Sequence, residues 1–117
     1  MVTYSRAAHA TFRAIAEPTR RRLLDALARG ARPAGALAAK FPSSRPAIAR
    51  HLRVLREARL VRVRREGRRQ IYELTPAPLQ AVRRWVDRYE VFWSVRLDEL
   101  GEYVERMEKS RRGGGGR

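Results

Sequence analysis

The 117-residue chain contains no cysteine, which excludes disulfide bridges, thiolate metal ligands and thiol redox switches. Histidine is almost as scarce, with only His9 and His51. A transition-metal site needs convergent imidazole or thiolate donors, so we expect none here. The sequence also has no nucleophile–base pair and no phosphate-binding glycine loop, which argues against an enzyme and against a bound cofactor.

Long apolar runs are absent as well. No stretch approaches the roughly 18 apolar residues that span a bilayer, and the N-terminus lacks the apolar run of a signal peptide. A role on a membrane surface is disfavoured too, because the long C-terminal helix predicted below carries balanced charge instead of a basic face. We therefore expect a cytoplasmic protein without a membrane partner.

Acidic residues are few: 12 Asp and Glu stand against 27 Lys and Arg, for a formal net charge of +15. A chain this positive attracts polyanions. The charge is unevenly spread, since residues 45–69 hold ten arginines and two acids, whereas residues 79–109 hold six bases and seven acids. One part of the chain thus suits nucleic acid, and another part has a different task.

The N-terminal half of the chain shows the apolar spacing of α-helices. Apolar residues three or four apart predict a first helix from Tyr4 to Ile15, and Pro18 begins a second helix that stops at Gly30. Pro33 opens a short third helix. Together these segments indicate a mainly α-helical N-terminal half.

A fourth helix, about four turns long, follows residues 42–44, whose two serines can each cap it. Pro46 lies in its first turn, where a missing N–H does no harm. From Leu60 the apolar period changes to two, which predicts an antiparallel hairpin that ends at Leu74 and has glycine in its turn.

A last helix of about thirty residues begins near Leu79, judged from apolar residues mostly three and four apart. These residues form a heptad-like apolar seam with more surface than the core of one small domain can bury. The seam therefore predicts an oligomer interface. Residues 110–117 are rich in Arg and Gly and are predicted to form a disordered tail. The expected fold class is mainly α with a small β-hairpin: a winged helix-turn-helix domain (α-α-α-α-β-β-α) over residues 1–109.

Three spaced motifs carry a family resemblance: E-P-T-R at Glu17–Arg20, P-A-I-A-R-H-L-R-V-L at Pro46–Leu55, and R-E-G-R-R at Arg65–Arg69. On these motifs the stretch from Phe12 to Leu74 resembles the ArsR-type bacterial transcriptional repressors. The segment WVDRYEVFWSVRLDELGEYVE looks like the last helix of a metal-independent branch of that family. The resemblance implies a homodimer that binds an inverted repeat in double-stranded DNA and blocks transcription.

The chain departs from the family pattern at two points. Members that sense metal use a cysteine pair in the short third helix, where this chain has Pro33 and Gly35, or aspartate and histidine on the last helix, which has no histidine here. Arg59 stands where the family usually places a glycine just past the fourth helix. A left-handed backbone there costs arginine more than glycine.

The expected DNA contacts lie at the start of the fourth helix, which reads bases in the major groove, and at the hairpin tip, whose crowded arginines reach phosphates or the minor groove. The residues expected to act on the helix are Ser43, Ser44, Arg45, Pro46, Arg50, His51 and Arg53. Those expected to act on the hairpin are Arg64, Arg65, Arg68 and Arg69. The expected dimer interface comprises Tyr4, Phe12, Trp85, Tyr89, Phe92, Trp93, Leu97, Leu100 and Val104.

Some alternatives stay open. His51 borders the apolar stripe of its helix, so a packed or phosphate-bound role is favoured over a metal-ligand role. The aromatic residues between 85 and 93 offer a pocket for an apolar effector as a second possibility. Arg20–Arg22 oppose the dipole at the start of their helix and need either DNA or an internal acid such as Asp25. A nonspecific or architectural nucleic-acid binder is the competing function.

Overall fold

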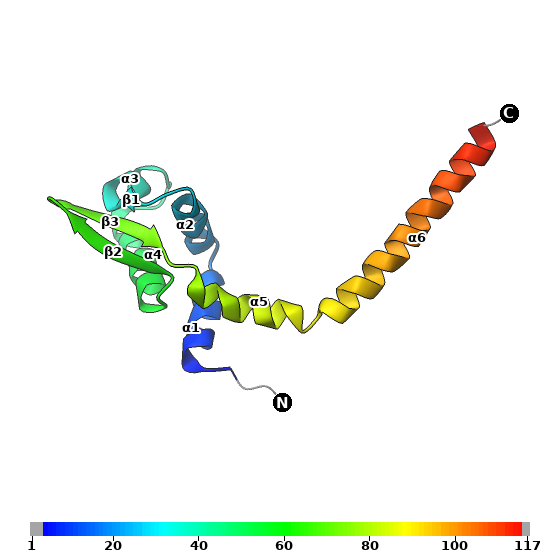
Figure 1. Cartoon of the computed structure of the whole chain (residues 1–117). Coiled ribbons are helices and arrows are strands. Elements are labelled where there is room, and N and C mark those ends of the chain that lie inside the picture. Colours follow the sequence, from blue (N-terminus) through cyan, green and yellow to red (C-terminus); the bar gives the residue numbers. More distant parts are fainter. Residues whose placement is uncertain (1–3, 116–117) are drawn as a thin grey trace. The chain divides into compact units, whose positions relative to one another are not determined.

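The computed structural model describes residues 4–115, apart from the side chains of residues 94–96 and 112–115. The chain divides into two compact units, Met1–Arg83 and Arg84–Arg117, which we call the N-terminal and C-terminal units. In the described residues the N-terminal unit combines helices with a three-stranded sheet, and the C-terminal unit is helical (Figure 1). The sequence predicted a single domain over residues 1–109, so the division after Arg83 is new.

Three of the four helices of the N-terminal unit begin at a side-chain cap. Ser5, Glu17 and Ser44 each accept a hydrogen bond from the backbone N–H three residues later. The helices are α1 (Arg6–Ile15), α2 (Pro18–Ala28), α3 (Ala34–Ala39) and α4 (Arg45–Glu57). The sequence therefore located all four helices.

The sheet has one strand more than the predicted hairpin. Its strands are β1 (Arg32–Pro33), β2 (Val61–Glu66) and β3 (Arg69–Leu74), in the antiparallel order β1-β3-β2. Two residues are too few to show a period, and Pro33 fits an edge strand because it has no N–H to donate. The turn between β2 and β3 consists of Gly67 and Arg68. Gly67 has φ +63°, as the first position of a type II′ turn requires.

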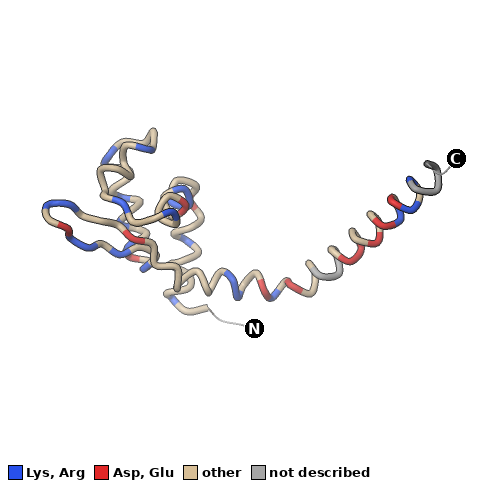
Figure 2. Tube along the Cα trace, turned by 45° about the horizontal axis from the view of Figure 1, so that its top comes forward, with Lys and Arg blue, Asp and Glu red and all other residues tan. Residues whose placement is uncertain are grey.

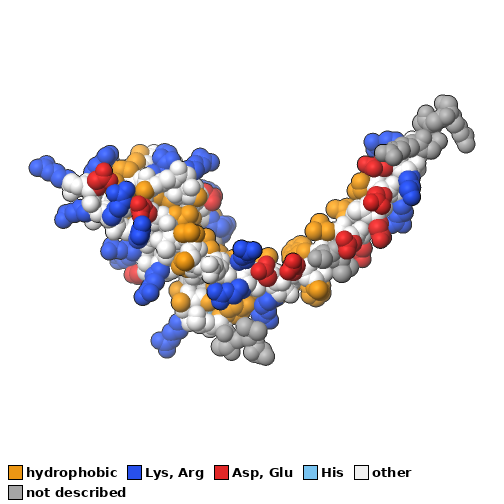
Figure 3. Space-filling view, in the orientation of Figure 1, with side chains coloured by type: hydrophobic (Ala, Val, Ile, Leu, Met, Phe, Trp, Pro, Cys, Tyr) orange, Lys and Arg blue, Asp and Glu red, His pale blue; other side chains and the backbone are white. Residues whose placement is uncertain are grey.

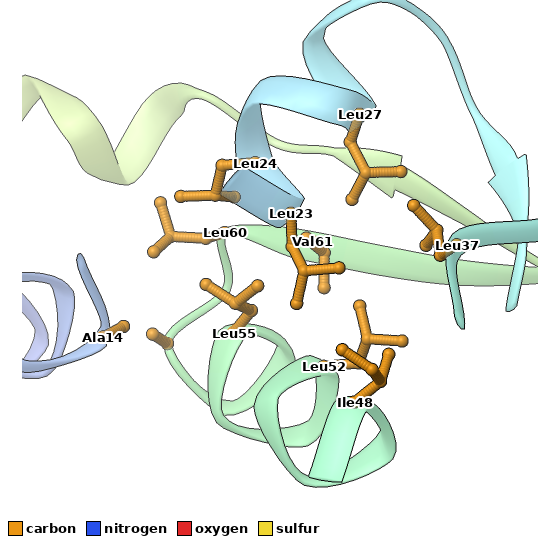
Figure 4. Close-up of a cluster of buried hydrophobic side chains, with 11 residues drawn as sticks. Ala14, Leu23, Leu24, Leu27, Leu37, Ile48, Leu52, Leu55, Leu60 and Val61 are labelled. Atoms are coloured by element: carbon orange, nitrogen blue, oxygen red, sulfur yellow. The ribbon is translucent and has the colours of Figure 1, made fainter. Parts of the chain in front are cut away.

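The core of the N-terminal unit joins the helices to the base of the sheet. Leu23 and Leu24 of α2 point toward Leu55 of α4 and toward Leu60 and Val61 at the start of β2 (Figure 4). Leu37 closes the same cluster from α3. Burial of each such leucine contributes about 1.5–3 kcal/mol. This packing fixes α4 against the hairpin within one unit.

The connection from α4 to β2 is a Schellman turn. The N–H of Leu60 donates to the carbonyl of Leu55 (2.9 Å), and the N–H of Arg59 donates to the carbonyl of Arg56 (2.9 Å). Arg59 is the residue in the left-handed conformation, with φ +62°. The predicted conflict between arginine and a glycine position is therefore real, and the buried pair Leu55 and Leu60 helps to hold the turn.

The single last helix predicted from Leu79 is wrong, because the structure divides that region into three helices. They are a 3-10 helix η1 (Ala77–Leu79), α5 (Gln80–Asp87) and α6 (Glu90–Gly115). The N–H of Tyr89 donates to the carbonyl of Val86 (2.9 Å), three residues back, and this tighter turn interrupts the α-helical ladder. No proline or glycine marks the break, so composition gave no sign of it.

The helix α6 also reaches into the segment predicted to be a disordered tail. The sequence placed the end of the folded chain at residue 109, whereas α6 continues to Gly115. Residues 116–117 of the predicted tail lie outside the described residues. None of the described helices combines the length and the apolar content of a membrane-spanning segment.

Candidate nucleic-acid interface

The fourth helix α4 follows α3 after a short turn, as in a helix-turn-helix motif. Ser44 is the residue that caps α4, because its Oγ accepts from the N–H of Ala47 (3.3 Å), and Ser43 is only half-buried beside it. Pro46 lies in the first turn, as predicted. The two serines thus have different surroundings, which the sequence did not distinguish.

One side of α4 is free of packing. Arg45, Pro46, Arg50 and Arg53 are all exposed, while the apolar stripe of the helix is buried against the core. Ala49 lies on the same exposed side and was not among the predicted contacts. Its spacing of three from Pro46 and four from Arg53 was the signal that sequence reasoning missed. The arrangement presents a narrow basic face with a small methyl group near its centre.

His51 points away from that face and toward the start of α2. Its Nδ1 lies 3.3 Å from Nη1 of Arg20 and 3.9 Å from Oε2 of Glu17. His51 on α4 therefore lies within reach of both a guanidinium and a carboxylate at the start of α2. The structure gives His51 partners at the start of α2, and the DNA contact expected of it stays a prediction.

Arg20 and Arg21 find partners that the sequence did not suggest. Arg20 donates from Nε to the carbonyl of Ala14 (2.6 Å) and from Nη2 to that of Arg13 (3.1 Å). Arg21 donates from Nη1 to the carbonyl of Ile15 (2.8 Å). These carbonyls lie at the end of α1, where the regular helical donors run out, although that of Arg13 also accepts from the N–H of Ala16 (3.3 Å). The two arginines are thus compensated by the end of the preceding helix, and the structure shows neither with Asp25.

Glu17, the cap of α2, lies next to Arg20 and His51. Partial burial acts to raise the pKa of Glu17, but the hydrogen bond from the N–H of Arg20 and the nearby His51 lower that pKa below its usual value. The carboxylate therefore remains charged at neutral pH. It joins the start of α2 to the imidazole on α4.

The hairpin formed by β2 and β3, which we call the wing, carries arginines along β2 and at its tip (Figure 2). On one face Glu73 accepts from Nε of Arg62 (2.7 Å) and from Nε of Arg64 (2.9 Å). Nη1 of Arg64 also donates to Glu66 (2.8 Å). The hydrogen bonds from Arg64 and Arg62 hold the pKa of Glu73 below its usual value. Arg64, predicted to contact DNA, is therefore engaged by two carboxylates.

The other three predicted wing arginines differ from Arg64. Arg65, Arg68 and Arg69 are exposed, and none makes an ion pair within the part of the chain that the structure describes. They lie on either side of the turn at Gly67. Three guanidinium groups this close repel one another unless an anion lies between them. The wing tip is therefore the stronger candidate for a phosphate contact.

The residues predicted for the dimer interface fall in both units. Tyr4 and Phe12 are half-buried and meet edge to face, with ring centroids 5.9 Å apart. The remaining residues of the predicted interface are exposed on α5, on α6 and on the turn between them: Trp85, Tyr89, Phe92, Trp93, Leu97, Leu100 and Val104. Hydrophobic side chains are visible along α6 next to acidic ones (Figure 3). Exposure of this many large apolar groups indicates a surface that another surface covers.

The aromatic residues proposed as an effector pocket form a surface ladder instead. Trp85 and Tyr89 meet edge to face with centroids 5.7 Å apart, and Tyr89 and Phe92 lie 6.3 Å apart. Each of the three is more than 40% exposed. Among the described residues, no three His, Asp or Glu side chains come together as metal ligands would.

Comparison with known proteins gives a consistent result. A family of helix-turn-helix domains matches residues 15–64. The HTH-type transcriptional regulator Rv2034 of Mycobacterium tuberculosis is 40% identical over 105 residues, which cover 90% of this chain and 94% of that protein. The match therefore extends through the winged-helix region and into α6.

Two solved structures share the fold. The crystal structure of the ArsR family transcriptional regulator RHA00566 superposes with a TM-score of 0.70 and 29% identity, over 80% of this chain and 97% of that chain. The second is the solution structure of the homodimeric winged helix-turn-helix DNA-binding domain Mb0332 from Mycobacterium bovis, a possible ArsR-family regulator. It superposes with a TM-score of 0.60 and 26% identity, over 78% of this chain and 94% of that chain.

Proposed function

Because the chain belongs to the ArsR family of winged helix-turn-helix transcriptional repressors, we propose that it represses transcription in the cytoplasm by binding an inverted-repeat operator as a homodimer, without a metal-sensing site. The observation that carries this proposal is the exposed face of α4. Arg45, Arg50 and Arg53 stand on it without an acidic partner in the described residues. Arginine at the start of such a helix pairs bidentately with guanine O6 and N7.

The direct test is a selection of genomic fragments that the protein binds, followed by fluorescence anisotropy at physiological salt. The selected inverted repeat is expected to bind at least about 100-fold more tightly than a scrambled duplex. Arg45→Ala should reduce that preference by about tenfold or more, because a base contact is lost. Arg68→Ala should weaken binding to both duplexes alike. Equal affinity of the wild-type protein for both duplexes would contradict the proposal and support the architectural alternative.

The homodimer is supported by the exposed apolar seam and by the homodimeric state of the Mb0332 domain. Trp93, Leu97, Leu100, Val104 and Met107 follow one another at steps of four, three, four and three, which is a heptad pattern. Two copies of the domain would present two α4 helices to successive major grooves about 34–36 Å apart. Light scattering on a sizing column tests the state directly, and a monomer at micromolar concentration would contradict it.

Regulation without metal is supported by the lack of cysteine and by the internal partners of His51. We expect the affinity for the selected repeat to change by less than about twofold after dialysis against EDTA or with stoichiometric Zn²⁺. Release of the DNA by Zn²⁺ would contradict this part of the proposal. Cu(I) serves as a further probe, since it favours the thiolate ligands that the chain lacks.

A further inference from the structure

The exposed side of α4 is not uniformly basic. From the first residue of the helix to Arg53, five residues are exposed, and three of them are arginines. The other two are Pro46 and Ala49, whose side chains carry no charge and no hydrogen-bonding group. They are three positions apart in one helix, so they lie on the same face. The N-terminal part of this face therefore has a small apolar patch, formed by Pro46 and Ala49.

The apolar patch has no part in the core. The residues that hold α4 in the N-terminal unit form its buried stripe, and neither Pro46 nor Ala49 is among the residues packed against the core cluster. Ala49 instead lies between Arg45 and Arg53, each four positions away along the helix. Any ligand that the arginines of this face bind will therefore cover the apolar patch as well.

A DNA duplex on this face presents mostly polar groups to it. The base edges in the major groove carry hydrogen-bond donors and acceptors, and one methyl group, at C5 of thymine. A donor or acceptor pressed against an alanine methyl and a proline ring loses its water without gaining a partner. A thymine methyl has no hydrogen bond to lose there, and its contact removes apolar surface from water. The patch therefore favours thymine over the other three bases.

We propose that Pro46 and Ala49 select the operator by contacting the 5-methyl group of one thymine in each half-site. This contact rests on the proposed DNA-binding function and adds a second base preference to it. Arg45 lies one helical turn before Ala49, so the guanine that it pairs with is close to that thymine. Each half-site is then recognised by one polar and one apolar contact from the same face of α4.

Removal of the methyl group alone tests this contact. Each thymine of the selected repeat is replaced in turn, in both half-sites at once, by deoxyuridine, which lacks only the C5 methyl group. At one position wild type should lose about tenfold in affinity, because burial of one methyl group contributes a factor of about three to four in each half-site. At the other thymines the loss should stay within about twofold. Fluorescence anisotropy at physiological salt gives each thymine-to-deoxyuridine ratio.

Two glycine variants assign the effect to Ala49. Ala49→Gly should lower the ratio at that position from about tenfold to about threefold or less, because the methyl group on the protein side is gone. Ala47→Gly is the matched control, since it costs the helix about as much but alters a half-buried residue outside the exposed face. It should keep the wild-type ratio. Pro46→Ala, which does not weaken the helix, should also lower the ratio and serves as the test if Ala49→Gly does not fold.

Methylated cytosine provides a second readout. It carries a methyl group at the same ring position as thymine but has the hydrogen-bonding groups of cytosine. With cytosine in place of the contacted thymine, 5-methylation in both half-sites should strengthen binding by wild type about tenfold. Ala49→Gly should reduce this gain to about threefold or less. A ratio in Ala49→Gly equal to that of wild type in both experiments would overturn the proposal.

Failure of this contact is distinguishable from failure of the proposed function. If wild type prefers the selected repeat to the scrambled duplex but tolerates deoxyuridine at every position, sequence-specific binding stands and the thymine contact is overturned. A selected half-site without any thymine overturns it too. If wild type binds the selected and scrambled duplexes equally, the proposed function fails, and the thymine contact fails with it.

Discussion

The two units of the chain use hydrophobic residues in opposite ways. Every buried hydrophobic residue among those described lies between Ala8 and Ile71, whereas every large exposed hydrophobic residue lies between Trp85 and Met107. Charge divides similarly, with arginine concentrated in residues 45–69 and near balance in residues 79–109. The N-terminal unit thus completes its own core and keeps a basic surface. The C-terminal unit has apolar surface left to bury.

The largest expected effect is on the core of the N-terminal unit. Leu55→Ala should lower the free energy of unfolding of that unit by about 3 kcal/mol, because Leu55 is fully buried and its removal leaves a cavity. Amide hydrogen exchange of α2 and α4 measures this change. Leu100→Ala, an equal truncation in the C-terminal unit, should alter the same amides by less than about 0.5 kcal/mol. A similar loss in both variants would erase the contrast between the units.

A polar substitution in the apolar seam of the C-terminal unit should weaken dimerisation. Leu100→Asn is expected to weaken dimerisation more than tenfold, which is about 1.4 kcal/mol or more, because a polar amide replaces a leucine of the heptad. Analytical ultracentrifugation measures the dissociation constant. Glu99→Asn, next to it but off the seam, should leave the constant within about twofold. If both variants dimerise like wild type, the seam is not the interface.

A smaller gain in stability is expected at the Schellman turn. Arg59→Gly should raise the free energy of unfolding by about 1 kcal/mol, since glycine adopts φ +62° without the strain that arginine carries there. Arg56→Gly, three residues earlier inside α4, should lower it by about 0.8 kcal/mol. Urea denaturation followed by circular dichroism gives both values. Loss of stability in Arg59→Gly would show that the arginine side chain compensates for its backbone.

The smallest effect concerns pH and the wing. The pKa of Glu73 lies below its usual value of 4.5 in the folded protein, because Arg64 and Arg62 donate to it. A lowered folded pKa gives stability that is present above the unfolded pKa and is lost as pH falls through the folded pKa. Glu73→Gln should therefore reduce the loss of stability on acidification below pH 4.5, as measured by thermal melting. Glu57→Gln, at an exposed acid on α4, is the control and should melt like wild type across the same range.

Sequence patterns predicted the helices and turns whose determining residues are close together in the sequence. The four N-terminal helices follow from apolar spacing, from prolines at the starts of α2 and α3 and from a serine cap at α4, and the hairpin follows from alternation around Gly67. The left-handed backbone at Arg59 also agrees with expectation, because the turn after α4 demands it. In each case the determining residues lie within a few positions of one another.

The features that were missed depend on residues far apart in sequence. The pairing of Arg64 with Glu73 follows from strand register, and that of Arg20 with His51 follows from the packing of α2 beside α4. The strand β1 exists only because β3 lies next to it. The interruption of the helix between α5 and α6 is local, yet no proline or glycine marks it in the sequence. Contacts of this kind need the assembled fold, which is why the wing appeared uniformly basic in the sequence.

The short strand β1 has a mechanical consequence for the wing. It pairs with β3 only at Tyr72 and Ile71, whereas β2 pairs with β3 along its whole length. The base of the wing is therefore held on both sides, while the tip beyond Ile71 is a two-stranded ribbon, a form that twists more readily and is less stable by itself. The arginines of the tip thus lie on the more flexible part of the wing, and the base of the wing is held in place by three strands. The tip can therefore adjust to local changes in the path of a ligand while α4 stays in place.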